Sequence, residues 1–170
     1  MRSLLIIPLL TFGCAGSKDA VRTEQTTYDP ELYEACAPDS ATDPPASCPR
    51  DDEGNWKTSR PPSSALLQGR RLLEEGLYEA SAMTLRQAIM YDGVEDDCGK
   101  LYARWLRGQA FYKNGQYPEA LKDFGYIVAS GANNPFYKDV GDWLVKLEGK
   151  VPRGALLACQ AQYRPDLAPQ

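Results

Sequence analysis

The feature that most constrains the fold is a turn signal that recurs along the second half of the chain. Gly76-Leu77-Tyr78 is followed by Gly115-Gln116-Tyr117 and then by Gly149-Lys150-Val151, at offsets of 39 and 34 residues. Glycine readily adopts the left-handed conformation that commonly ends a helix. A turn repeated at this period predicts a stack of similar supersecondary units.

Apolar residues with a helical period fill the segments between these turns. The pattern predicts six helices, with approximate bounds of 65–74, 78–91, 100–114, 117–130, 135–148 and 153–163. Ser63 and Ser64 suit a helix cap, and Pro135 suits a helix start. Helices joined by short glycine turns form antiparallel hairpins. We therefore expect an all-α fold of two to three hairpins.

Small and bulky residues also recur around each turn. Small residues precede the first two turn glycines by seven places and follow the aromatic position by three: Gly69, Gly108, Ser81, Ala120 and Gly154. Gly141 is one place out of register, and seven places after the aromatic position come Leu85, Phe124 and Ala158. Small residues at these places would let two helices cross closely. A generic helical bundle is the alternative.

These positions resemble the tetratricopeptide repeat, a 34-residue helix–turn–helix unit. The second copy is the clearest, with Gly108, Phe111, Gly115, Tyr117, Ala120 and Phe124 in place. It departs from the family at Arg107, where a leucine is usual. The resemblance covers residues 63–164 and implies a short solenoid.

In this family the first helix of each hairpin lines a concave groove. The resemblance therefore implies a partner-binding groove formed by Leu66, Arg70, Leu73, Tyr102, Trp105, Gln109, Tyr112 and Lys113. The third copy would add Lys138, Asp142, Val145 and Lys146. An aromatic stripe flanked by charges suits a bound peptide or helix. Alternatively, the chain's own tether or last helix fills the groove, and Trp105 and Tyr112 belong to the core.

The start of the chain has the pattern of an export signal. Met1 and Arg2 precede an apolar run over residues 4–12, which is too short to span a bilayer. Thr11-Phe12-Gly13-Cys14 resembles the lipobox of bacterial lipoproteins, although Thr11 stands where an aliphatic residue is usual. The resemblance implies a signal peptide over 1–13 and a Cys14 acylated with palmitate-type chains. The same resemblance implies, from Ala15 in place of an aspartate after the cysteine, an outer-membrane location facing the periplasm. The alternative is cleavage after Ala15, which releases a soluble protein.

Four cysteines remain if Cys14 is removed or acylated, an even number that suits an oxidising compartment. Three pairings are possible, and we favour Cys36–Cys48 with Cys98–Cys159. A metal or redox site is disfavoured because the chain has no C-x-x-C pair and no histidine.

Composition narrows the remaining organisation and function. Residues 14–62 are rich in proline and predict an extended tether, followed by a helical domain over 63–164 and a tail over 165–170. The net charge of -4 argues against nucleic acid. The lack of histidine argues against most catalytic triads and metal sites. No enzyme activity, cofactor or metal is expected.

We therefore expect a lipid-anchored adaptor or assembly factor that binds another envelope protein or peptide segment. The alternative is a permanent structural subunit of a larger envelope or secretion complex.

Overall fold

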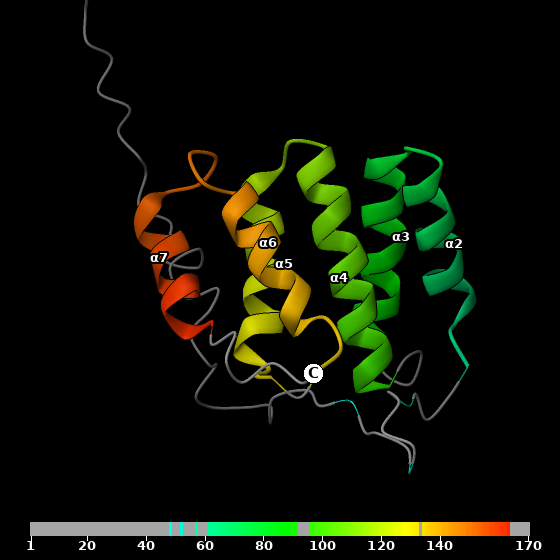
Figure 1. The fold of residues 1–170 in the computed structure, drawn as a ribbon. Helices are drawn as coiled ribbons and strands as arrows, with labels where there is room; N and C mark the ends of the chain where they lie inside the picture. Colours follow the sequence, from blue (N-terminus) through cyan, green and yellow to red (C-terminus); the bar gives the residue numbers. More distant parts are fainter. Residues whose placement is uncertain are drawn as a thin grey trace, which may run out of the picture.

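A computed structural model describes residues 48, 52, 57, 61–91, 96–132 and 134–163. Within these ranges every regular element is an α-helix, which confirms the all-α prediction (Figure 1). The predicted signal peptide over 1–13, Cys14, Cys36 and the tail over 165–170 lie outside the described residues. None of the described helices is long and apolar enough to cross a membrane.

The six helices confirm the predicted bounds to within three residues at each end. With the labels of Figure 1, they are α2 (Ser64–Glu74), α3 (Tyr78–Met90), α4 (Asp97–Lys113), α5 (Tyr117–Ala129), α6 (Tyr137–Lys146) and α7 (Arg153–Gln162). Side chains cap two of them at the N-terminus. Ser63 accepts a hydrogen bond from the Leu66 amide at 3.1 Å, and Asp96 accepts one from the Gly99 amide at 2.8 Å. Asp96 is thus the N-cap of α4.

Glycines with positive φ turn the chain between the paired helices. Gly76 lies between α2 and α3, Gly115 between α4 and α5, and Gly149 between α6 and α7, with φ values of 80°, 79° and 71°. Residues other than glycine are strained in this conformation. The recurring turn signal therefore corresponds to three hairpin turns, as the sequence predicts.

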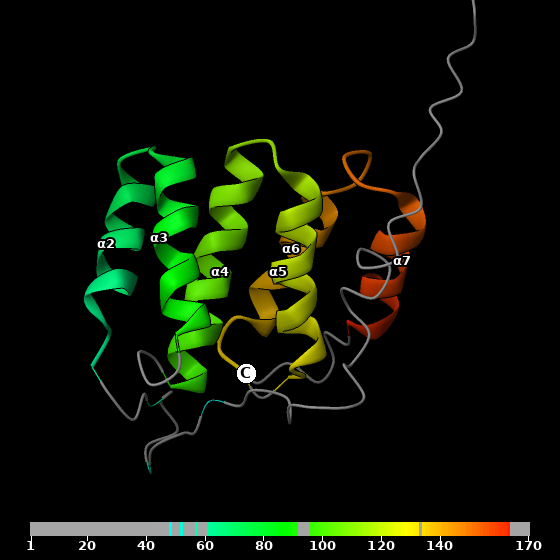
Figure 2. The ribbon, with the colours of Figure 1, turned by 180° about the vertical axis from the view of Figure 1, so that it is seen from behind.

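The hairpins stand side by side in chain order, with α6 in front of α5 in Figure 1 and behind it in Figure 2. Helix α3 packs against both α2 and α4, and α2 also contacts α4 directly. Two apolar clusters form the core, one shared by α2, α3 and α4 and the other by α4, α5, α6 and α7 together with Cys48. Trp105 and Phe111 of α4 pack against both clusters, so α4 joins the two halves of the stack.

The predicted close crossings are present in the first two hairpins. A methyl group added at Gly69 would collide with the side chain of Leu85, and one at Gly108 would meet the Phe124 ring at 2.7 Å. The Ser81 hydroxyl donates a hydrogen bond to the Gly69 carbonyl at 2.7 Å, so this small residue also links α2 to α3.

The third hairpin differs from the prediction. Gly154 is exposed and Ala158 half-buried, whereas Ala155 and Cys159 are buried one place later. The reason is the longer turn, because residues 147–152 join α6 to α7 while three residues suffice in the other two hairpins. The ring of Tyr163, just beyond the end of α7, packs against Gly141, where an added methyl group would meet it at 2.8 Å. Helices α6 and α7 consequently touch much less than the helices of the first two hairpins.

The expected disulfide pairing is wrong. Cys48 pairs with Cys98, with 4.8 Å between their Cα atoms, which excludes both Cys36–Cys48 and Cys98–Cys159. Cys159 is also disulfide-bonded, and its partner lies outside the described residues. The prediction favoured the nearest cysteine in sequence for Cys48, but Cys98 lies in the first turn of α4 and shares the core cluster with Cys48. One point of the predicted tether is therefore buried against the helices.

Candidate functional site

The eight predicted groove residues lie on α2 and α4 and fall into two groups. Leu66 and Leu73 are 2% and 7% exposed and belong to the core, so they support the face from beneath. Arg70 and Lys113 are exposed, and the remaining four are half-buried: Tyr102, Trp105, Gln109 and Tyr112. The accessible residues among the eight therefore lie on one face of α4, with Arg70 of α2 beside it.

The aromatic residues of this face form a connected cluster with α6. We call Tyr102, Trp105, Tyr112, Phe136 and Trp143 the aromatic cluster. Tyr102 and Trp105 stack on Phe136 with ring centroids 5.4 and 5.8 Å apart, and Trp105 and Tyr112 meet Trp143 edge-on at 6.1 and 5.2 Å. Stacked and edge-on pairs stabilise such a group beyond simple burial.

The aromatic cluster is anchored in the core but is not enclosed by it. Trp143 stacks on the fully buried Phe124 at 5.3 Å, and Trp105 meets the same ring at 5.8 Å. All five members nevertheless remain half-buried. Trp143 therefore packs on the core while remaining partly accessible.

The sequence prediction missed Phe136. It is the residue that precedes α6 and stacks on both Tyr102 and Trp105. Its separation of seven places from Trp143 puts both on one side of a helix, which could have indicated it. Its contacts with α4 depend on how the hairpins pack.

Three lysines lie at the C-terminal ends of α4 and α6 and in the turn after α6, and we call them the lysine rim. The Lys146 ammonium lies 4.2 Å from the Trp143 ring centroid, and the Lys150 ammonium lies 4.7 Å from the Tyr117 ring and 5.5 Å from the Tyr112 ring. Lys113 lies 5.5 Å from the Tyr78 ring. The Tyr112 hydroxyl donates a hydrogen bond to the Lys146 carbonyl at 3.3 Å, which joins the end of α4 to that of α6.

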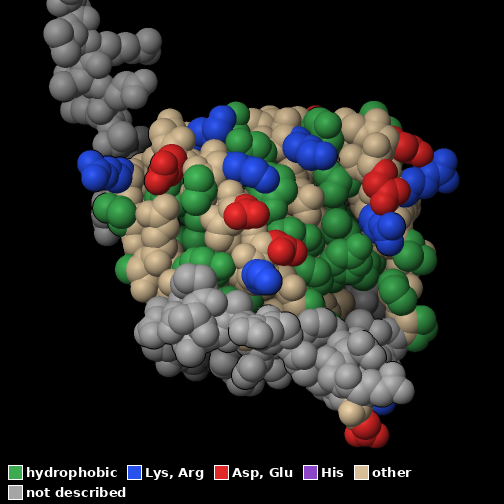
Figure 3. Space-filling view, in the orientation of Figure 1, with side chains coloured by type: hydrophobic (Ala, Val, Ile, Leu, Met, Phe, Trp, Pro, Cys, Tyr) green, Lys and Arg blue, Asp and Glu red, His purple; other side chains and the backbone are tan. Residues whose placement is uncertain are grey.

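Figure 3 shows how apolar and charged side chains are distributed over this face. Apolar side chains gather over α4, with charged side chains over α6 on one side and over α2 on the other, and basic groups lie along the upper edge. On α2, Arg70 donates a hydrogen bond to Glu74 at 2.8 Å. That bond, with a further contribution from the Tyr102 phenol, raises the pKa of Arg70 above its ordinary value.

A buried ionic group lies between α4 and α5, outside this face. Asp123 is 1% exposed and accepts two hydrogen bonds from Arg107, at 2.8 and 2.7 Å, and a longer one from Arg104 at 3.4 Å. Arg104 also stacks over the Tyr126 ring at 3.8 Å. Burial lowers the pKa of Arg104 below its ordinary value, while the Asp123 carboxylate opposes that change. The arrangement holds α5 on α4, and it explains why an arginine stands at position 107.

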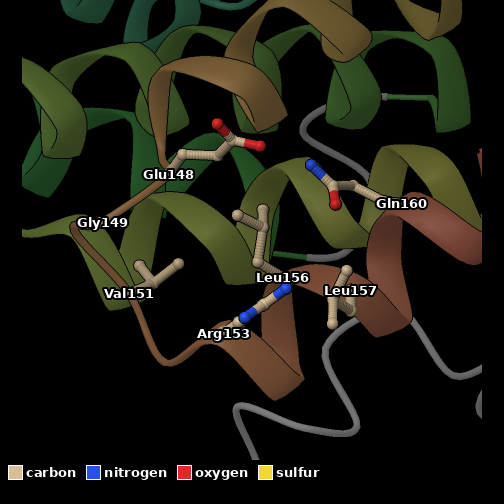
Figure 4. A pocket seen from close by; sticks show the side chains of 7 residues that line it. All are labelled: Glu148, Gly149, Val151, Arg153, Leu156, Leu157 and Gln160. Atoms are coloured by element: carbon tan, nitrogen blue, oxygen red, sulfur yellow. The ribbon is translucent and has the colours of Figure 1, made fainter.

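A separate hollow of about 410 Å³ lies between α7 and the turn before it. Its lining consists of Glu148, Gly149, Val151, Arg153, Leu156, Leu157 and Gln160. Figure 4 shows the polar ends of Glu148 and Gln160 facing each other across the hollow. The long turn of the third hairpin opens this space, which the sequence pattern did not predict. In the part of the chain that the structure describes, no group of three metal-ligating side chains occurs.

No protein-family model, curated protein or solved structure matches this chain.

Proposed function

We propose that this chain is a tetratricopeptide-like adaptor that binds a peptide or helix of another envelope protein on the face of α4. The observation that carries the proposal is the aromatic cluster, whose rings are fixed by mutual contacts and yet remain half-buried. Tyrosine and tryptophan are the residue types that most often dominate binding energy at interfaces.

The rigidity of this face favours binding over a purely structural role. Rings already held by stacking lose little side-chain entropy when a partner covers them. Trp105 and Tyr112 each contact two or more other rings, so their orientations are set before any partner arrives. A partner would therefore meet a preformed apolar surface with charged margins.

The repeat assignment rests on local geometry that agrees with the family's pattern. Gly76, Gly115 and Gly149 all adopt positive φ at hairpin turns, and Gly69 and Gly108 lie at close helix crossings. The envelope location rests on the lipobox-like residues before Cys14, and the disulfides fit an oxidising compartment. Attachment would be by the lipid anchor alone.

A permanent structural subunit is the second candidate, and the outer surfaces favour it. Several large apolar side chains that are not members of the aromatic cluster are at least half exposed: Leu67, Leu77, Met83, Met90, Tyr91, Val145 and Leu157. They include residues of α3, α6 and α7, so a larger assembly could cover them. Such a subunit would aggregate when purified alone, whereas an adaptor would stay monodisperse.

Site-specific photo-crosslinking in the native envelope tests the proposal. Crosslinkers replace Arg70, Gln109 and Lys113 on the proposed face, with Arg86 and Gln87 on α3 as controls. We expect one protein to be captured from the three face positions and not from α3. Equal capture at both sets would refute the groove, and crosslinks confined to the chain's own residues 15–47 would mean that the chain fills its own face.

A further inference from the structure

The strongest feature left unexplained is the lysine rim. The chain as a whole is acidic, with a net charge of -4, yet Lys146 and Lys150 lie against rings of the aromatic cluster. Lys113 directly follows Tyr112, a member of that cluster, at the end of α4, and its ammonium faces the Tyr78 ring. All three are exposed, and their ammonium groups lie over ring faces. A ring face attracts the charge but accepts no conventional hydrogen bond, so the three N–H donors of each lysine remain available.

The nearby carboxylates do not neutralise the rim. Among the described residues, Glu74 and Glu75 at the end of α2 pair with Arg70 and Arg71, and the other ion pairs converge on Asp123. Glu148 follows α6 and lines the hollow beside α7. The rim lysines therefore have no carboxylate within ion-pair distance in the described ranges.

Helix stabilisation accounts for only part of this arrangement. Lysines in the last turn of a helix interact favourably with its dipole, and Lys113 and Lys146 occupy the last turns of α4 and α6. Lys150 lies beyond α6, where this effect has faded, and is held instead over the rings of Tyr117 and Tyr112. Because Tyr112 also touches Trp143, the ammonium groups of Lys150 and Lys146 lie against two neighbouring rings of the aromatic cluster.

We propose that the lysine rim makes the α4 face selective for an acidic segment of a partner protein. In this arrangement the partner's apolar side chains cover the aromatic cluster while its Asp or Glu side chains pair with Lys113, Lys146 and Lys150. The inference rests on the proposed function and specifies the partner's chemistry. A nucleic acid is disfavoured as the occupant because three lysines on an acidic chain do not form an extended basic stripe.

The chain itself contains an acidic segment that competes as the occupant of the α4 face. Residues 15–47 carry seven Asp and Glu against two Lys and Arg. We assign the face to a separate protein because the proposed function is that of an adaptor. An extended chain spans about 3.3 Å per residue, so this segment is long enough to reach the rim from Cys48, and the two sources must be separated by experiment. The experiment below separates the two sources.

The test measures fluorescence anisotropy of labelled peptides binding to the full chain carrying Cys14→Ser. The probe is a twelve-residue peptide of glutamate and leucine with both ends blocked. The control peptide has the same sequence with glutamine in place of glutamate. We expect the acidic probe to bind about tenfold more tightly than the glutamine peptide, since three exposed ion pairs together contribute that much. Salt should reduce the difference.

Matched variants decide whether the rim is responsible. The triple variant Lys113→Gln, Lys146→Gln, Lys150→Gln should lose about tenfold in affinity for the acidic probe. The control variant Lys57→Gln, Arg86→Gln, Arg153→Gln changes the net charge equally, at exposed positions outside the proposed face, and should bind as the parent does. Circular dichroism confirms that both variants are folded.

Three outcomes would overturn the inference. Equal losses in both triple variants would show a general charge effect. Equal binding of the acidic and glutamine peptides would leave the α4 face as a binding surface but remove its selectivity, so the proposed function would survive. A tenfold gain in probe affinity after neutralising the acidic residues of 15–47 would identify the chain itself as the occupant.

Discussion

At the scale of single residues, the least expected feature is the ionic group at Asp123. The tetratricopeptide-like pattern leads one to expect a leucine at position 107, and a leucine there would pack without any partner. Arg107 instead makes two hydrogen bonds to the buried Asp123, and Arg104 adds a third. Replacing one member alone leaves buried charge uncompensated, which costs more than the intact group contributes.

The variant Asp123→Asn should therefore be markedly destabilised. We expect its free energy of unfolding to fall by about 3 kcal/mol, toward the lower end for a broken buried ion pair because both arginines retain some solvent contact. Urea denaturation followed by circular dichroism measures this change. Asp142→Asn, at an exposed position on α6, is the matched control and should unfold like the parent. A loss below 1 kcal/mol would mean that the group contributes little to holding α5 on α4.

At the scale of elements, turn length separates the first two hairpins from the third. Three-residue turns keep α2 with α3 and α4 with α5 in close contact, whereas six residues between α6 and α7 move the buried positions of α7 by one place. The first two hairpins therefore follow the sequence pattern closely. The Cys48–Cys98 disulfide then fixes the start of α4, the helix that carries most of the proposed binding face.

The Cys48–Cys98 disulfide should contribute substantially to stability. It closes a loop of 50 residues, for which the chain-entropy model gives about 4 kcal/mol. The double variant Cys48→Ala, Cys98→Ala should melt several degrees below the parent in a calorimetric scan. Adding reductant should lower the melting temperature of the parent further, because Cys159 is also disulfide-bonded. A double variant that melts with the parent would contradict a stabilising role.

At the scale of the whole molecule, the proposal combines a membrane anchor with a binding face. In the proposal, attachment is by acyl chains on Cys14, at the end of the lipobox-like residues. Acyl chains gain about 0.8 kcal/mol for each CH₂ group that enters the bilayer, and two or more chains hold a protein firmly. The proposed face would then be confined to the neighbourhood of one membrane.

Metabolic labelling with a clickable palmitate analogue tests the anchor. The parent should incorporate the label and partition into the detergent phase, whereas Cys14→Ser should do neither. Cys36→Ser is the control, since it removes a cysteine outside the lipobox-like residues and should keep the label. Labelling of the Cys14→Ser protein would show that the acyl chains are attached to another residue, and it would contradict the proposed anchor at Cys14.

The sequence by itself determined the helices, their caps and their turns. Ser63, Gly76 and Gly115 act through hydrogen bonds or backbone conformations within a few residues, so a local pattern was enough to locate them. The small residues at Gly69 and Gly108 were also readable, because the two helices they bring together are neighbours in the chain.

Only the tertiary structure decided the disulfide pairing, the stacking of Phe136 on Tyr102, and the arginines that hold Asp123. Each of these joins residues whose distance depends on how whole helices pack and on the length of the turns between them. A shift of one residue in α7 rotates its side chains by about 100°, which a turn three residues longer is sufficient to cause. Local propensity therefore specified the helices, caps and turns, and packing between hairpins specified which side chains meet on the face of α4.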